Sequence, residues 1–163
     1  MSENIKTKKH PPLKSSLRNT IDMDTLNKVR EAATVIQPHE TKIVNAFVQY
    51  VVKLESPGNS QEPLASLEQL HKTITDNFRS FCAGEISTEY ISIREQIGRI
   101  LVHIHLTPDQ FLYAHHLMVE EMISILMDKF RFKPGRMKTL VPAVLRLAAL
   151  DQKIVIESYM KEM

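Results

Sequence analysis

Apolar residues recur at intervals of three and four along the chain from residue 21 onward, which is the spacing of the buried face of an α-helix. These stripes predict helices over about residues 21–37, 43–54, 63–83, 88–105, 107–130 and 137–159. Proline and glycine interrupt the pattern at Pro38, residues 56–60, Gly84 and residues 132–135. The pattern therefore predicts an all-α domain of about six helices over residues 21–163.

The two helices nearest the C-terminus are the longest and the most apolar around their circumference. Thr107, Pro108 and Gln110 mark the start of the first, because they suit the cap, first and third helical positions. Pro142 falls within the first turns of the second, where it should kink the helix or delay its start. Apolar breadth of this kind indicates burial on two sides, so we expect a homodimer formed through the last two helices.

Composition agrees with an ordinary globular protein, since 43% of the 163 residues are apolar and 25% are charged. The sequence contains no run of about 18 apolar residues, which a membrane-spanning helix would need, and no N-terminal apolar segment that would predict secretion. We therefore expect a cytoplasmic protein without a membrane partner. The single cysteine, Cys82, excludes an internal disulfide, and its place on an apolar helix face favours a buried, inert thiol.

Residues 1–20 differ from the rest of the chain in charge. Five basic residues (Lys6, Lys8, Lys9, Lys14 and Arg18) stand against Glu3, for a net charge of +4, whereas the whole chain carries +2. This segment has few apolar residues, which predicts a disordered basic tail. No basic groove with interleaved aromatic residues follows it, so we expect no nucleic-acid partner.

Three stretches resemble the globin-coupled sensor family, the sensor globins of aerotaxis transducers and of some cyclases and kinases. They are residues 83–94 (Ala-Gly-Glu-Ile-Ser-Thr-Glu-Tyr-Ile-Ser-Ile-Arg), Ile-Gly at 97–98 and Ile-His-Leu-Thr-Pro at 104–108. Residues 149–159 resemble the family's last helix. The resemblance covers most of residues 21–159 and implies a globin-like fold.

The chain departs from that family where haem would be held. In haem-binding members, Ile-Gly or Ile-Ala is followed two residues later by the proximal histidine, and the corresponding residue here is Leu101. Leucine has no lone pair to offer iron. The family's distal tyrosine follows a phenylalanine on the second helix, whereas Val48 follows Phe47 here. The resemblance therefore implies a member that does not bind haem.

The histidines of this chain are poorly placed to replace the missing proximal ligand of haem iron. His103 lies about 200° around the helix from Leu101, whereas His105 lies nearer the face of Leu101 but at the helix end. Neighbouring His115 and His116 diverge and cannot chelate one metal, and no Cys/His spacing suits zinc, so we expect no metal site. A haem-based oxygen sensor with an unusual ligand such as His105 is the alternative.

A globin-like interior without haem must fill with side chains or hold another apolar ligand. The candidates that line this volume are Phe47, Val51, Ile74, Phe78, Ile97, Leu101, Ile104 and Leu112. A plain hydrophobic core would produce the same periodicity, and that interpretation stays open. No nucleophilic motif and no glycine-rich phosphate loop is present, so we expect no enzymatic activity.

The chain is most similar to the small haem-free sensor globins of spore-forming bacteria, which are related to the sensor domain of a sporulation histidine kinase. That resemblance implies a fatty acid in an apolar tunnel and a halide ion nearby. Anion candidates are Arg94 and the inward one of His115 and His116, with a surface ion pair to Glu89 or Glu95 as the alternative role of Arg94.

We find no kinase or cyclase segment, so the resemblance implies a non-enzymatic regulator. Such a protein would inhibit sporulation signalling by sequestering the kinase's ligand or by binding its related sensor domain. A structural globin module of a stress-signalling complex is a further alternative.

Overall fold

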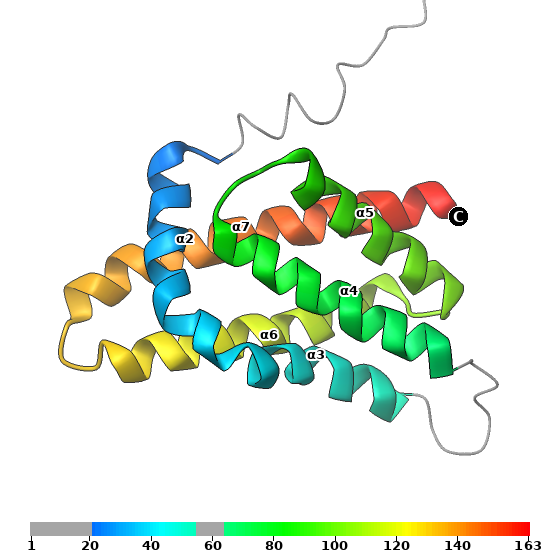
Figure 1. Cartoon of the computed structure of the whole chain (residues 1–163), viewed down its shortest axis with the longest axis horizontal. Coiled ribbons are helices and arrows are strands. Elements are labelled where there is room, and N and C mark those ends of the chain that lie inside the picture. Colours follow the sequence, from blue (N-terminus) through cyan, green and yellow to red (C-terminus); the bar gives the residue numbers. More distant parts are fainter. Residues whose placement is uncertain (1–20, 55–63) are drawn as a thin grey trace, which may run out of the picture.

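The computed structural model describes residues 21–54 and 64–163, and this part of the chain is helical without any strand. The all-α prediction is confirmed. The helices are α2 (Met23–Ile36), α3 (Glu40–Leu54), α4 (Leu64–Ala83), α5 (Thr88–His103), α6 (Pro108–Lys129) and α7 (Pro134–Glu162) (Figure 1). The predicted tail at residues 1–20 and the predicted break at residues 56–60 lie outside the described residues.

Local sequence signals set most of the helix ends. The Asp22 carboxylate accepts a hydrogen bond of 2.8 Å from the Thr25 backbone N–H at the start of α2. At the start of α6, the Gln110 side chain accepts a 3.0 Å bond from the Thr107 N–H, as the predicted capping box requires. Gly84 follows α4 with a φ of +62°, a conformation that glycine adopts without strain.

The helix end predicted at Pro38 is confirmed, because α2 ends at Ile36 and a short 3₁₀ turn, Gln37–His39, joins it to α3. The expectation that Pro142 delays the last helix is wrong: α7 begins at Pro134 and continues through Pro142. Pro134 occupies the first turn, where a helical N–H has no partner within the helix and proline is therefore tolerated.

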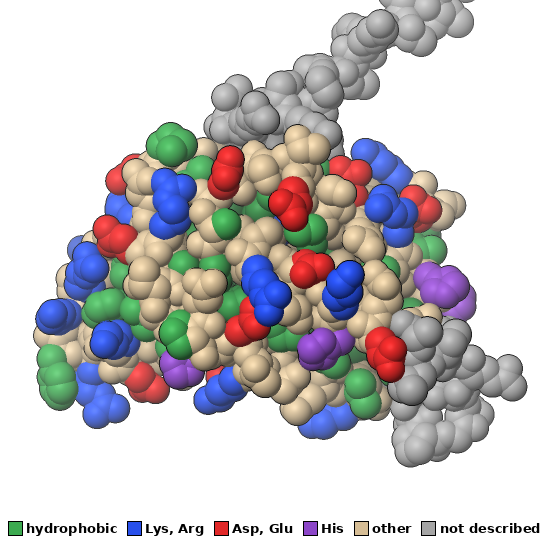
Figure 2. Space-filling view, viewed as in Figure 1, with side chains coloured by type: hydrophobic (Ala, Val, Ile, Leu, Met, Phe, Trp, Pro, Cys, Tyr) green, Lys and Arg blue, Asp and Glu red, His purple; other side chains and the backbone are tan. Residues whose placement is uncertain are grey.

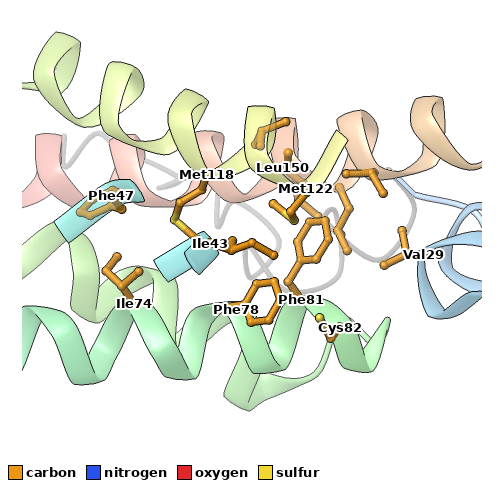
Figure 3. Packing of buried hydrophobic residues seen from close by; sticks show 14 of the residues in the cluster. Val29, Ile43, Phe47, Ile74, Phe78, Phe81, Cys82, Met118, Met122 and Leu150 are labelled. Atoms are coloured by element: carbon orange, nitrogen blue, oxygen red, sulfur yellow. The ribbon is translucent and has the colours of Figure 1, made fainter. Parts of the chain in front are cut away.

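The helices surround one hydrophobic core. Helix α5 packs chiefly on α7 and α3 on α6, while α2 crosses α7 (Figure 1). Side chains from α3, α4 and α6 meet between these helices, among them Phe47, Phe78 and Met118 (Figure 3). Burial of each such side chain contributes about 1.5–3 kcal/mol. Within the described part of the chain, no helix is both long and apolar enough to cross a membrane.

Helices α5 and α7 approach each other unusually closely at Gly98. A Cβ atom added to this glycine would lie 2.7 Å from the Ser158 side chain and 2.8 Å from the Tyr159 backbone nitrogen. The Ser158 hydroxyl donates a 2.7 Å hydrogen bond to the Glu95 carbonyl at the same crossing. The absent side chain therefore fixes the distance between the two helices that carry the buried charges described next.

Candidate ligand pocket and buried polar cluster

Leu101 lies inside the core on α5 and is only 1% exposed. The sequence resemblance predicts that this is the position at which a haem-binding relative presents a nitrogen to iron. An isobutyl side chain has no atom that can coordinate a metal. Ile97 on α5 and Ile104, which follows the end of α5, are also buried and apolar.

Most of the predicted pocket residues meet in this core. Seven of them are between 0% and 7% exposed: Phe47, Val51, Ile74, Phe78, Ile97, Leu101 and Ile104. Because so little of their surface is accessible to water, these side chains occupy the volume themselves. They form a packed interior in this structure.

The prediction that Leu112 lines the pocket is wrong. It is 38% exposed, so it does not line the interior. Its neighbour Phe111 takes the inward position, with its ring centre 6.0 Å from that of Phe47. A step of one residue along a helix turns the side chain by about 100°, which places Leu112 outside.

The described histidines do not supply an axial ligand to this core. His39, His71, His103, His105 and His116 are all exposed. His105 follows α5 in a left-handed conformation, with a φ of +58°. Only His115 is buried among the described histidines, and it contacts polar side chains instead. No cluster of three or more His, Cys, Asp or Glu residues in the described ranges could hold a metal ion.

A buried charged cluster links four helices beside the apolar core. The Arg94 guanidinium on α5 and the Asp151 carboxylate on α7 are 0% and 1% exposed, respectively. Arg94 donates from Nε to Asp151 Oδ1 over 2.9 Å, and the Tyr90 hydroxyl donates to the same oxygen. The Arg94 guanidinium also lies over the Tyr90 ring, 3.4 Å from its centre.

The remaining N–H groups of Arg94 also have acceptors. Nη1 donates to the Ser80 hydroxyl over 2.5 Å and to the Tyr90 carbonyl over 3.0 Å. Nη2 donates to the Asn77 carbonyl over 3.1 Å and to Asp151 Oδ2 over 3.5 Å. A guanidinium has five N–H donors, so the protein satisfies all of them.

Charge pairing determines how the acidic groups of this cluster titrate. Burial acts most strongly on Asp151 and would raise its pKa, but the charge of Arg94, the nearby His115 imidazole and the hydrogen bonds from Arg94 outweigh it and lower the pKa. Burial raises the pKa of Tyr90 well above its ordinary value, and the negative charge of Asp151 adds to that effect. The cluster therefore contains a carboxylate and a neutral phenol at neutral pH.

This geometry does not support the predicted anion site. Arg94 is neither at the surface nor paired with Glu89 or Glu95; its charge is balanced by Asp151. An anion placed beside it would find no free donor and would be repelled by the carboxylate.

The two histidine candidates separate. His115 points inward, with Nδ1 3.0 Å from the Gln152 amide nitrogen and Nε2 3.9 Å from Asp151 Oδ2. His115 therefore lies between the Gln152 amide and the Asp151 carboxylate. The His116 side chain is 69% exposed and lies 3.9 Å from Glu120.

Sequence reasoning missed Asp151 and Tyr90 as members of this site. The available signal was an aspartate within the apolar face of the last helix, since a buried carboxylate requires a buried partner.

At Cys82, burial and the negative charge of Glu40 raise the pKa to about 12. That residue is therefore a thiol rather than a nucleophilic thiolate.

A shallow apolar hollow of about 400 Å³ lies on the outer side of α6 and α7. Val119, Ile123, Met127 and Leu145 line it together with polar side chains such as His116. Met127 and Leu145 are about half exposed. This is the face on which the sequence predicts a dimer.

The model of the family described as Protoglobin matches residues 17–163, which include every described helix. No curated protein matches the chain.

Proposed function

Since this chain belongs to the Protoglobin family, it is a globin-type sensor domain, and we propose that it works without haem as a non-enzymatic, cytoplasmic regulator. The observation that carries the proposal is Leu101, an aliphatic side chain buried where iron would need a nitrogen ligand. The exposure of His105 argues against the haem-binding alternative, because that side chain lies outside the core.

We propose that the ligand is a fatty acid, as the resemblance to haem-free sensor globins implies. Each buried methylene contributes about 0.8 kcal/mol, so an acyl chain suits a core of Phe, Ile and Leu side chains. The chain would have to displace side chains such as Phe47 and Phe78, which now fill the volume. Ligand occupancy would therefore change helix packing, as a sensor requires. A halide ion beside Arg94 is not part of the proposal, for the reasons of charge and donor occupancy given above.

The proposed output is inhibition of sporulation signalling through a related sensor histidine kinase. The protein would act by mass action, either by removing the kinase's fatty acid or by pairing with its sensor domain. The apolar hollow on α6 and α7 suits both self-association and such pairing, because Met127 and Leu145 remain half exposed there.

Denaturing extraction of the natively purified protein, followed by mass spectrometry, tests the ligand. We expect a near-equimolar fatty acid and no porphyrin. Release of porphyrin would contradict the haem-free proposal. Release of neither would contradict the fatty-acid proposal alone.

A kinase autophosphorylation assay tests the output. We expect the added protein to lower phosphorylation, and excess fatty acid to restore it if sequestration is the mechanism. Met127→Glu should weaken direct pairing and self-association, measured by light scattering, whereas Met160→Glu is the control at an exposed residue outside the hollow. Unchanged phosphorylation at any concentration of the protein would contradict the regulatory proposal.

A further inference from the structure

The turn between α6 and α7 presents a single aromatic side chain to solvent. Phe132 is 90% exposed, whereas Phe130 two residues earlier is buried, with the Arg136 guanidinium 5.6 Å from its ring centre. The Lys133 N–H donates a 2.8 Å hydrogen bond to the Phe130 carbonyl, and α7 begins at the next residue. The outward position of Phe132 is therefore fixed by an anchored turn.

Cations surround this aromatic residue. We call residues 129–138 the basic tip; its exposed basic side chains are Lys129, Arg131, Lys133, Arg136 and Lys138. Lys and Arg side chains gather at this end of the molecule, where α6 and α7 meet (Figures 1 and 2). Since the whole chain carries a net charge of only +2, the charge is strongly concentrated here.

Few acidic groups neutralise the basic tip. Arg131 lies 4.0 Å from Asp128, and Arg136 lies 3.2 Å from Glu31. The three lysines form no ion pair with any residue that the structure describes. The N-terminus of α7, which begins at Pro134, adds the positive end of a helix dipole to the same corner.

We propose that the basic tip docks on an anionic lipid surface, with Phe132 entering the interfacial layer. An exposed aromatic residue ringed by Lys and Arg is the combination that binds proteins to the surface of anionic bilayers. The tip is the convex end of a helical hairpin with one exposed aromatic residue, Phe132. This single exposed ring is not the row of stacking platforms that nucleic-acid binding would favour.

This contact is peripheral. The earlier expectation of no membrane partner followed from the absence of a spanning segment, which does not exclude contact with the surface. Each lysine or arginine near an anionic bilayer increases binding about fivefold, and the attraction decays within a Debye length of about 8 Å. The binding should therefore be weak, reversible and sensitive to salt. It is independent of whether the core holds a fatty acid.

The chain contains no tryptophan, so Phe132→Trp introduces a single fluorescent probe at the tip. We expect its emission to shift to shorter wavelength with vesicles of phosphatidylcholine and 30% phosphatidylglycerol, and not with phosphatidylcholine alone. Met160→Trp, at another exposed site near the other end of α7, should show no shift. An unchanged Phe132→Trp spectrum in anionic vesicles would overturn the proposal.

Vesicle co-sedimentation of the full chain separates the tip from the rest of the protein. Lys133→Glu with Lys138→Glu should lower binding at least about tenfold, because two attractive charges become repulsive. Lys53→Glu with Lys72→Glu is the matched control, since both lysines are exposed on α3 and α4. Phe132→Ser should weaken binding several-fold.

Two results would refute this docking mode. The first is equal binding by the two double variants, which would place the attraction elsewhere on the chain. The second is a shift of the Phe132→Trp emission by single-stranded RNA at lower concentrations than by vesicles, which would make nucleic acid the partner.

Discussion

Asp151→Asn is the sharpest structural test, because it removes the carboxylate that pairs with the buried Arg94. Arg94 is fully buried, and its Nε lies 2.9 Å from Asp151 Oδ1. Breaking a buried ion pair from one side costs about 3–5 kcal/mol, since the other charge stays buried without a partner. A domain has about 5–15 kcal/mol of stability in total. The variant should therefore melt about 6–20 °C lower than the wild type.

Urea unfolding at pH 7, followed by circular dichroism, measures this loss. Asp24→Asn is the matched control, because Asp24 forms an exposed pair with Lys28 at 2.6 Å and should contribute little. The double variant Arg94→Met with Asp151→Leu should recover most of the lost stability, because no unpaired charge remains. The reasoning fails if Asp151→Asn costs no more than Asp24→Asn.

Three further predictions follow from the fold. Gly98→Ala should lower the free energy of unfolding in urea by about 1–3 kcal/mol, because the added Cβ would lie 2.7 Å from the Ser158 side chain on α7. Gly135→Ala, whose added Cβ would meet nothing within 4 Å, should not lower it. Equal effects of the two variants would contradict the close crossing of α5 and α7. His105→Gly should stabilise by about 0.5–1 kcal/mol by relieving the φ of +58°, and a loss of stability would refute that strain. Because folding lowers the pKa of Asp151, the Asp151 carboxyl of the unfolded chain takes up a proton at a higher pH than that of the folded chain. The contribution of Asp151 to stability is therefore present above pH 3.8 and is lost as the pH falls through the pKa of the folded state. Unfolding of the Asp151→Asn variant, measured as a function of acid pH, should lack this loss of stability.

The sequence predicts the helices and their inward faces well, because both depend on local spacing. Phe47, Ile74 and Leu101 are buried where the three- and four-residue pattern puts them. The cap at Thr107 and the stop at Gly84 depend on a few neighbouring atoms and are also confirmed.

What the sequence could not predict depends on contacts between distant segments. Arg94 and Asp151 are 57 positions apart, and no local pattern pairs them. Their pairing follows from the crossing of α5 and α7, which in turn depends on the close approach at Gly98. Leu112 was misplaced by one position on α6, because Phe111 and Leu112 are equally apolar and only packing against Phe47 selects between them.

The absorption spectrum of the purified protein, after incubation with excess haemin and removal of the free ligand, shows whether the core can hold haem. We expect no Soret band above that of residual free haemin, because Leu101 offers no ligand and the core is filled. A sharp Soret band with one haem per chain, lost when a single side chain such as His105 or His115 is replaced by alanine, would contradict the haem-free proposal.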